Sequence, residues 1–249
     1  MKKGFLQIVK KVVDEADILL EIIDARFPTK SRNADLERII KLSGKKLLLV
    51  LNKADLVSIE NVKKQKELIG VKSVFVSAKK KQGTIKLREA IGKLSDKNEV
   101  KVGVVGYPNT GKSSIINMLK GKKSSRVAAI AGFTKGMQYV RISTKLILID
   151  SPGIIPLEEQ DEILMVMLSA KNIQSLEDLE GTGIEVAGEL LKSIPEKLKN
   201  FYGVEAQNGE EFLEKLALKR KKLLKGGSPN ITEAARLLIT DFQRGKIVL

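Results

Sequence analysis

The chain has 249 residues, of which 43% are hydrophobic and 30% are charged, a mixture typical of a globular protein that excludes disorder over its whole length. It contains no cysteine and no histidine, which excludes disulfides, thiolate–zinc sites and every catalytic scheme that needs a thiol or an imidazole. The net charge is +15 and uneven: residues 1–155 hold 32 basic and 14 acidic groups (+18), whereas residues 156–249 hold 13 and 16 (−3).

The first 150 residues alternate apolar runs with amphipathic runs. Continuous apolar runs predict strands, at Ile18–Ile23, Leu47–Leu51, Ser73–Val76, Val100–Val105, Met137–Ile142 and Leu146–Ile149. Helical spacing of apolar residues predicts helices at Leu36–Leu42, Asn61–Ile69, Ile85–Leu94 and Ser113–Leu119. This alternation predicts an α/β domain with a mostly parallel six-stranded sheet, in which the two strands near residue 140 form one antiparallel pair at an edge.

Beyond Pro156 the pattern becomes helical throughout. Helices are expected at Glu162–Ala170, Ile184–Ile194, Glu210–Leu224 and Thr232–Phe242. We therefore expect two domains, an α/β domain over residues 1–160 and a smaller all-helical domain over residues 161–249. The longest uncharged run has ten residues, Val102 to Gly111, which is too short to span a membrane, and the basic N-terminus does not resemble a signal peptide. A cytoplasmic protein without a membrane partner is expected.

The segment Gly106–Ser113 fits the phosphate-loop pattern G-x-x-x-x-G-K-[ST], and its context between a predicted strand and a predicted helix supports that interpretation. Its glycines let backbone amides turn toward phosphates, and the helix N-terminus adds the positive end of its dipole. We expect Lys112 to reach the β- and γ-phosphates and Ser113 to ligate magnesium. The residues of this segment expected to bind the nucleotide are Asn109, Thr110, Gly111, Lys112, Ser113 and Ser114.

A second motif, Asp150-Ser-Pro-Gly153, lies at the end of the predicted strand Leu146–Ile149. An aspartate at this place can hold magnesium through water, and the Gly153 amide can contact the γ-phosphate. A lone DxxG is common, so the weight of this motif comes from its place, 38 residues after Lys112 and at the end of the next strand pair.

Two further motifs predict recognition of guanine. In Asn52-Lys53-Ala54-Asp55 the Asp55 carboxylate can accept two hydrogen bonds, from guanine N1 and from its exocyclic amine. Adenine lacks that donor pair, so the site selects GTP over ATP by leaving polar groups unpaired for the wrong base. The stem of Lys53 can lie along the base. The segment Ser77-Ala78-Lys79 can complete the pocket with a backbone amide to guanine O6.

These motifs are those of a GTPase, but the base motifs precede the phosphate loop. That order resembles the circularly permuted GTPases of ribosome assembly, the YlqF/YawG or RbgA-like family. Three further segments resemble that family: Asp24–Asn33 its DARxPxxSRN segment, Gly132–Gly136 its PGxTK switch with Ala131 in place of proline, and Gly226–Lys246 its terminal helix. The resemblance implies that Thr134 binds magnesium and senses the γ-phosphate, and that Lys112, Thr134 and Gly153 serve catalysis. Asp24 and Arg26 are either a functional pair or a capping aspartate and a surface arginine.

The residue after the DxxG motif is Ile154, whereas many GTPases have a glutamine there that orients the attacking water. Slow intrinsic hydrolysis is therefore expected. Asn109 matches the asparagine that coordinates potassium in potassium-activated GTPases, and such an ion can stabilise charge in the transition state. The other possible source of catalysis is a group supplied by the ribosome.

The leading hypothesis is a monomeric GTP-hydrolysing switch that binds a pre-ribosomal large subunit through rRNA. Clustered basic residues favour a phosphate backbone as partner, although a lysine-rich solvated surface is the alternative. Two basic clusters are candidates, Lys120–Arg126 and Lys219–Lys222 with Lys225. Two other functions remain open: a GTPase with a protein partner in another role, and an RNA-binding module for which turnover is incidental.

Overall fold

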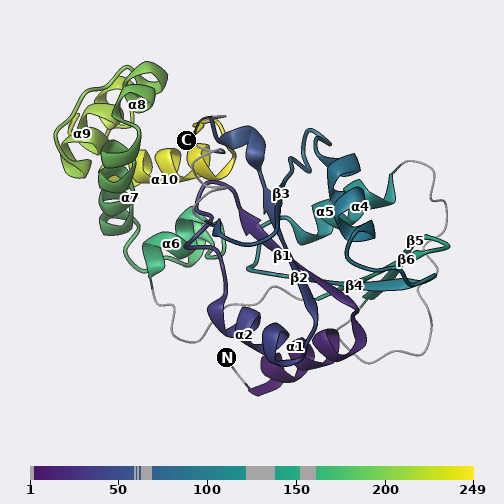
Figure 1. Cartoon of the computed structure of the whole chain (residues 1–249). Coiled ribbons are helices and arrows are strands. Elements are labelled where there is room, and N and C mark those ends of the chain that lie inside the picture. Colours follow the sequence, from purple (N-terminus) through teal and green to yellow (C-terminus); the bar gives the residue numbers. More distant parts are fainter. Residues whose placement is uncertain (1–2, 59, 61, 63–68, 122–137, 152–160) are drawn as a thin grey trace. The chain divides into compact units, whose positions relative to one another are not determined.

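The computed structural model describes residues 3–58, 60, 62, 69–121, 138–151 and 161–249. It divides into two compact units, Met1–Gln160 and Asp161–Leu249, which are described separately (Figure 1). No helix in these described stretches is both long and apolar enough to cross a membrane.

The first unit is built on one sheet of six strands among its described residues. The strands are β1 (Ile18–Asp24), β2 (Lys46–Asn52), β3 (Ser73–Phe75), β4 (Val100–Val105), β5 (Gln138–Ser143) and β6 (Leu146–Asp150). Their order across the sheet is β3-β2-β1-β4-β6-β5, and every pairing is parallel except that of β5 with β6. The predicted sheet, with one antiparallel pair at an edge, is confirmed.

Helices cover both faces of this sheet, as Figure 1 shows. They are α1 (Lys3–Glu15) and α2 (Ala34–Leu42) on one face, and α4 (Thr84–Gly92) and α5 (Lys112–Lys120) on the other. Each face has its own apolar core: Val12 and Ile40 pack with Leu19 on the first, and Leu87 and Ile115 pack with Leu20 on the second. Alternate residues of β1 thus enter opposite cores, because side chains of a strand alternate between faces.

Helix α1 was not predicted, although Val9, Val12, Val13 and Ala16 have helical spacing and are buried. The scattered lysines of this segment hid the pattern. The helix expected at Asn61–Ile69 lies mostly outside the described residues.

The second unit is helical. Its elements are α6 (Glu162–Met167), a 3-10 turn η2 (Ile173–Ser175), α7 (Leu179–Ser193), α8 (Pro195–Tyr202), α9 (Gly209–Lys219) and α10 (Ile231–Gln243). Helix α7 is central and packs on both α9 and α10. Where α7 crosses α10, a Cβ on Gly183 would lie 2.2 Å from the Ala235 Cβ, so only glycine permits this close approach.

Several helix boundaries in this unit differ from those predicted, and α6 ends at Met167, before the predicted Ala170. Helix α7 begins at Leu179 with Asp178 as its N-cap, and neither Gly181 nor Gly183 interrupts it. Gly181 lies against the Asp178 side chain that caps the helix, and Gly183 packs against Ala235. Helix α9 ends at Lys219, where the sequence predicted continuation to Leu224. After it, Lys221 adopts a positive φ of 54°, and the chain turns back in a short hairpin. Helix α8 was not predicted at all; Pro195 opens it at its first turn.

A buried carboxyl group joins β1 to α2. Glu21 is fully buried, and its Oε1 accepts the Asn33 backbone N–H at 2.7 Å, at the N-cap of α2. Burial, together with the nearby Glu37 carboxylate, raises the pKa of Glu21 to about 8. Glu21 is therefore a neutral acid in the folded protein at neutral pH.

Replacing Glu21 with glutamine removes this titration and keeps an oxygen that accepts the Asn33 N–H. The folded-state pKa of about 8 exceeds the ordinary value of 4.5, so Glu21 stabilises the fold fully below pH 4.5 and loses this effect as pH rises through 8. We expect wild-type stability to fall with rising pH across that window relative to Glu21→Gln, by at most about tenfold in the folding constant per pH unit. Urea denaturation across this range measures the difference, and parallel curves would contradict the expectation.

Candidate nucleotide-binding site

The predicted motifs meet at one edge of the sheet. Strands β1 and β2 end side by side, with Asp24 opposite Asn52, and β6 ends with Asp150 opposite Val104 of β4. Because these strands are parallel, the segments that follow them lie on the same side of the sheet. Ligands of open α/β sheets bind at this carboxyl edge.

The phosphate loop has the backbone that its glycines allow. Gly106 and Gly111 have φ angles of +135° and +100°, which side chains disfavour. A Cβ on Gly106 would lie 2.4 Å from the Ile22 carbonyl oxygen, and one on Gly111 would lie 2.2 Å from the Asn52 Nδ2. Asn109 also has a positive φ, of 57°, and is exposed. The loop therefore passes close to β1 and β2.

Asn52 connects the two halves of the site. Its side chain is buried, and its Nδ2 donates to the Thr110 carbonyl oxygen at 2.8 Å. Its Oδ1 accepts the Ala78 backbone N–H at 3.0 Å. One amide group thus ties the phosphate loop to the segment Ser77–Lys79. Ser77 is buried, its hydroxyl accepts the Lys80 N–H at 3.1 Å, and Lys79 is exposed.

Lys112 lies at the first position of α5 and is turned back into the loop. Its Nζ donates to the carbonyl oxygens of Gly106 and Tyr107 at 3.2 and 2.8 Å. Burial lowers the pKa of Lys112 to about 8, against the opposing effect of the Asp150 carboxylate. The next residues of the helix, Ser113 and Ser114, are exposed.

Asp150 ends β6 facing this lysine. Burial raises its pKa, and Lys112 and the Ser151 backbone amide oppose that effect. Its Oδ1 is buried, and within the described residues it has no hydrogen-bond partner. Buried acceptors without a partner are rare in folded proteins. Ser113, whose exposed side chain carries a hydroxyl, directly follows Lys112 in the sequence. Carboxylate and hydroxyl oxygens of this kind have the chemistry that magnesium selects.

Lys53 is held by a buried ion pair. Its backbone has a positive φ of 63°, and its Nζ lies 2.8 Å from Asp24 Oδ2. The same oxygen receives Arg26 Nη2 at 2.8 Å. Both Asp24 and Arg26 are buried, so the interpretation of Arg26 as a surface arginine is wrong. Asp55 is half-buried in the 3-10 turn η1 (Ala54–Leu56) that follows.

The contact between Asp24 and Lys53 was not predicted. It joins the ends of two neighbouring strands. The sequence signal for it is that Asp24 and Lys53 each lie at or just beyond the end of an apolar run. Two other predicted site residues, Thr134 and Gly153, lie outside the described residues, as does Ile154. Their places relative to Lys112 and Asp150 stay predictions.

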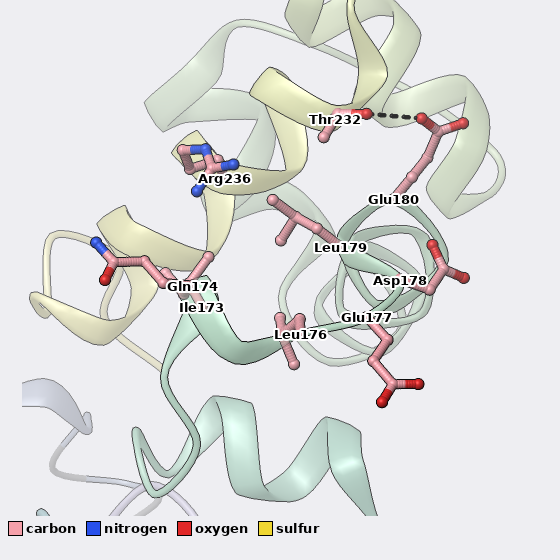
Figure 2. A pocket seen from close by; sticks show the side chains of 9 residues that line it. All are labelled: Ile173, Gln174, Leu176, Glu177, Asp178, Leu179, Glu180, Thr232 and Arg236. Atoms are coloured by element: carbon pink, nitrogen blue, oxygen red, sulfur yellow. Dashed lines mark hydrogen bonds between the residues drawn. The ribbon is translucent and has the colours of Figure 1, made fainter.

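Figure 2 shows a hollow of about 300 Å³ in the helical unit. It lies between η2, the start of α7 and α10, and none of the predicted nucleotide-binding residues lines it. Glu177, Asp178 and Glu180 gather at one end, where the Thr232 hydroxyl donates to Glu180 Oε2 at 2.9 Å. Carboxylates repel phosphates, so the hollow does not suit a nucleotide.

Comparison with known proteins identifies relatives of this chain. Residues 101–205 match the family described as 50S ribosome-binding GTPase. The chain is 41% identical over 245 residues to a GTP-binding protein of Methanocaldococcus jannaschii, covering 97% of this chain and 65% of that protein. It is 36% identical to nucleolar GTP-binding protein 2 of Schizosaccharomyces pombe, covering 95% and 46%. The chain thus spans between about half and two thirds of the length of these relatives.

Two solved structures have the same fold over their whole length. The GDP-bound structure of T. maritima YlqF has a TM-score of 0.71 at 26% identity, covering 96% of this chain and 95% of that one. The GNP-bound structure of T. maritima YlqF has a TM-score of 0.69 at 25% identity, covering 99% and 96%. In our chain the base motifs precede the phosphate loop, yet the sheet brings them to one edge. The resemblance to the YlqF type of circularly permuted GTPases, expected from the order of the motifs, is thus confirmed.

Proposed function

We propose that this chain binds and hydrolyses GTP and acts as a nucleotide-dependent switch in assembly of the large ribosomal subunit. The observation that carries this proposal is the Asn52 side chain, which ties the phosphate loop to the Ser77–Lys79 segment. A nucleotide whose phosphates lie in that loop then has its base beside Asp55. The relatives named for GTP binding and for 50S ribosome binding support the same function.

Base selection follows from the groups that line this end of the site. The Asp55 carboxylate accepts from guanine N1 and from the exocyclic amine, a backbone amide of Ser77–Lys79 donates to O6, and the Lys53 stem covers one face of the base. Adenine has an acceptor at N1 and a donor at position 6, the reverse of guanine, and no amine at position 2. It therefore leaves the carboxylate and the amide unpaired, which costs far more than a lost contact in water.

Magnesium belongs to this proposal, held by Ser113, Asp150 and Thr134. The unpartnered buried Asp150 Oδ1 and the hydroxyl donors fit its preference for oxygen ligands. When bound, the ion would supply positive charge to the transferring phosphoryl group. We assign potassium to Asn109, an exposed residue of the phosphate loop, because it matches the asparagine of potassium-activated GTPases.

Among the chain's own residues, Lys112, Thr134 and Gly153 are the proposed catalytic groups. Lys112 exchanges the carbonyl oxygens of Gly106 and Tyr107 for phosphate oxygens, and Gly153 donates its amide to the γ-phosphate. No side chain is in the usual place to orient water, because Ile154 follows the DxxG motif. Turnover therefore depends on charge supplied by potassium or by the ribosomal particle.

The switch acts through the chain that leaves β6. Asp150 ends the last strand of the first unit, and the second unit begins at Asp161. Loss of the γ-phosphate releases contacts to the segment between them, as in other GTPases. The nucleotide state is thereby transmitted along the chain to the helical unit.

The partner in this proposal is rRNA of a pre-ribosomal particle, bound by a monomer in the cytoplasm. A basic segment at and after the end of α9 supports it, because its basic residues are exposed although their unit as a whole is not basic. These residues are Lys219, Arg220, Lys221, Lys222 and Lys225. The solvated helix face considered for this cluster does not apply beyond Lys219, where the helix ends. Part of the other cluster, Lys122 to Arg126, lies outside the described residues.

Nucleotide choice tests the base site. We expect the wild type to bind GDP and GTP, with ADP and ATP at least about a hundredfold weaker, as for sites that recognise a polar edge. Asp55→Asn should shift preference toward xanthosine diphosphate, whose extra oxygen accepts from the asparagine amide. Titration with fluorescent nucleotides measures this, and Asp35→Asn, an exposed residue of α2, is the matched control. Comparable affinity of the wild type for ADP would falsify the guanine assignment.

Turnover in matched sodium and potassium buffers tests the source of catalysis. We expect slow hydrolysis in sodium, faster hydrolysis in potassium, and a larger gain with purified ribosomal particles. The potassium gain should stay below the roughly 10³- to 10⁵-fold of an arginine finger, because potassium polarises more weakly. Asn109→Ala should lose the potassium effect and keep GDP binding. Equal rates in sodium and in potassium, each with and without particles, would show an intrinsic catalytic group in the chain. A potassium effect that survives Asn109→Ala would place the ion elsewhere.

Sedimentation with ribosomal particles separates the proposed role from its alternatives. We expect the chain to join large-subunit particles with a non-hydrolysable GTP analogue and to leave them with GDP. Lys221→Gln/Lys222→Gln should weaken this binding and its salt dependence, because fewer counterions are released from RNA. Lys192→Gln/Lys197→Gln is a control with the same charge change at exposed positions of α7 and α8. Binding independent of nucleotide would favour an RNA-binding module, and no binding would favour a protein partner.

A further inference from the structure

The ion pair of Asp24 and Arg26 lies next to the proposed base site and contacts Lys53, one of the residues expected to bind the base. Both side chains are buried, with exposed fractions of 0% and 4%. Arg26 Nε donates to Asp24 Oδ1 at 3.0 Å and Nη2 donates to Oδ2 at 2.8 Å, a two-pronged contact. The Arg26 backbone N–H also donates to Oδ1, at 3.0 Å.

Lys53 completes this cluster from the neighbouring strand. Its Nζ shares Asp24 Oδ2 with Arg26, at 2.8 Å. The ends of the two strands are also joined there through the backbone, since the Ala25 N–H donates to the Asn52 carbonyl oxygen at 2.8 Å. The end of β1 therefore fixes the position of the lysine that follows β2.

Burying a cluster of charges of this kind costs free energy. Removing a carboxylate and two cations from water carries a penalty that their attraction only partly offsets. The positive φ of Lys53 adds backbone strain, which persists only where surrounding structure enforces it. The flexible four-carbon stem of a lysine has several rotamers, and the ion pair selects one of them.

We propose that Asp24 and Arg26 are positioning residues that hold the Lys53 stem in place for guanine nucleotides. This inference rests on the proposed function and deepens it. Arg26 keeps Asp24 ionised, and Asp24 binds the Lys53 ammonium, so the stem is ordered before the nucleotide arrives. Binding then avoids the cost of immobilising a long side chain. Neither Asp24 nor Arg26 contacts the nucleotide.

The test is a mutant cycle between the pair and the lysine. Asp24→Asn/Arg26→Gln replaces two opposite charges by amides of similar shape. Because both charges are removed together, neither residue of the pair keeps a charge that has lost its partner in the other. Lys53→Met keeps an apolar stem and removes the ammonium. We expect each variant to weaken GDP binding about threefold to tenfold, which corresponds to the cost of ordering one long side chain. All three substitutions together should be no weaker than Lys53→Met, within about twofold, because the pair acts through Lys53.

Inorganic triphosphate provides a readout that general damage to the fold would move. It occupies the phosphate loop without a base, so its affinity should be the same in wild type and in Asp24→Asn/Arg26→Gln. Ser31→Ala is the control within the same turn: the Ser31 hydroxyl accepts the Asp24 N–H at 3.0 Å and donates to the Phe27 carbonyl oxygen at 2.7 Å, without contacting Lys53. It should leave GDP affinity unchanged within about twofold.

The outcomes separate this inference from the function on which it rests. Losses that multiply in the combined variant, wild-type GDP affinity in Asp24→Asn/Arg26→Gln, or an equal loss of triphosphate binding would each overturn it. Preference of the wild type for ADP would instead overturn the guanine-binding function itself. If Asp24→Asn/Arg26→Gln does not fold, Lys53→Arg decides the question: a guanidinium still reaches Asp24, so it should retain more GDP affinity than Lys53→Met, and equal losses would overturn the proposal.

Discussion

Two hydrogen bonds from one buried amide determine the shape of the candidate site. Asn52 donates to the Thr110 carbonyl and accepts from the Ala78 N–H, and both partners belong to loops far from it in sequence. The arrangement leaves no room for a side chain on Gly111, whose Cβ would collide with the same amide. The glycine and the asparagine are therefore one constraint. Through Asn52, each of the two loops restrains the position of the other.

The parallel sheet makes the order of the motifs along the chain unimportant. Strand β1 pairs in parallel with β2 on one side and with β4 on the other, Ile18 facing both Lys46 and Val102. The strand before the phosphate loop is fourth in sequence but sits between β1 and β6. Connections can be cut and joined elsewhere as long as these pairings remain, because the loops at the carboxyl edge depend on neighbours in the sheet and not on chain order.

Features with local causes were predictable, and features that depend on packing were not. Apolar runs located the strands, and the phosphate loop was recognisable because glycine spacing and the following helix are encoded together. The early start of α7 was not, because Gly183 is explained by Ala235 on another helix. The link from Asp24 to Lys53 was missed for the same reason: it exists only because β1 and β2 end side by side. A buried arginine two residues after a strand resembles a surface one until its partner is known.

The pKa shifts of Lys112 and Asp150 have a different main cause from that of Asp24. Asp24 is buried among two cations, and despite burial these lower its pKa to about 2. For Lys112 and Asp150 burial outweighs their mutual attraction, so the pKa of the lysine falls and that of the aspartate rises. Both groups are partly desolvated, and their mutual attraction offsets only part of that cost. Phosphates placed beside Lys112 would stabilise its ammonium form, and a cation at Asp150 would stabilise its carboxylate. The first unit thus combines a carboxylate, Asp24, whose charge is satisfied without a ligand, with a charge pair, Lys112 and Asp150, that a ligand would complete.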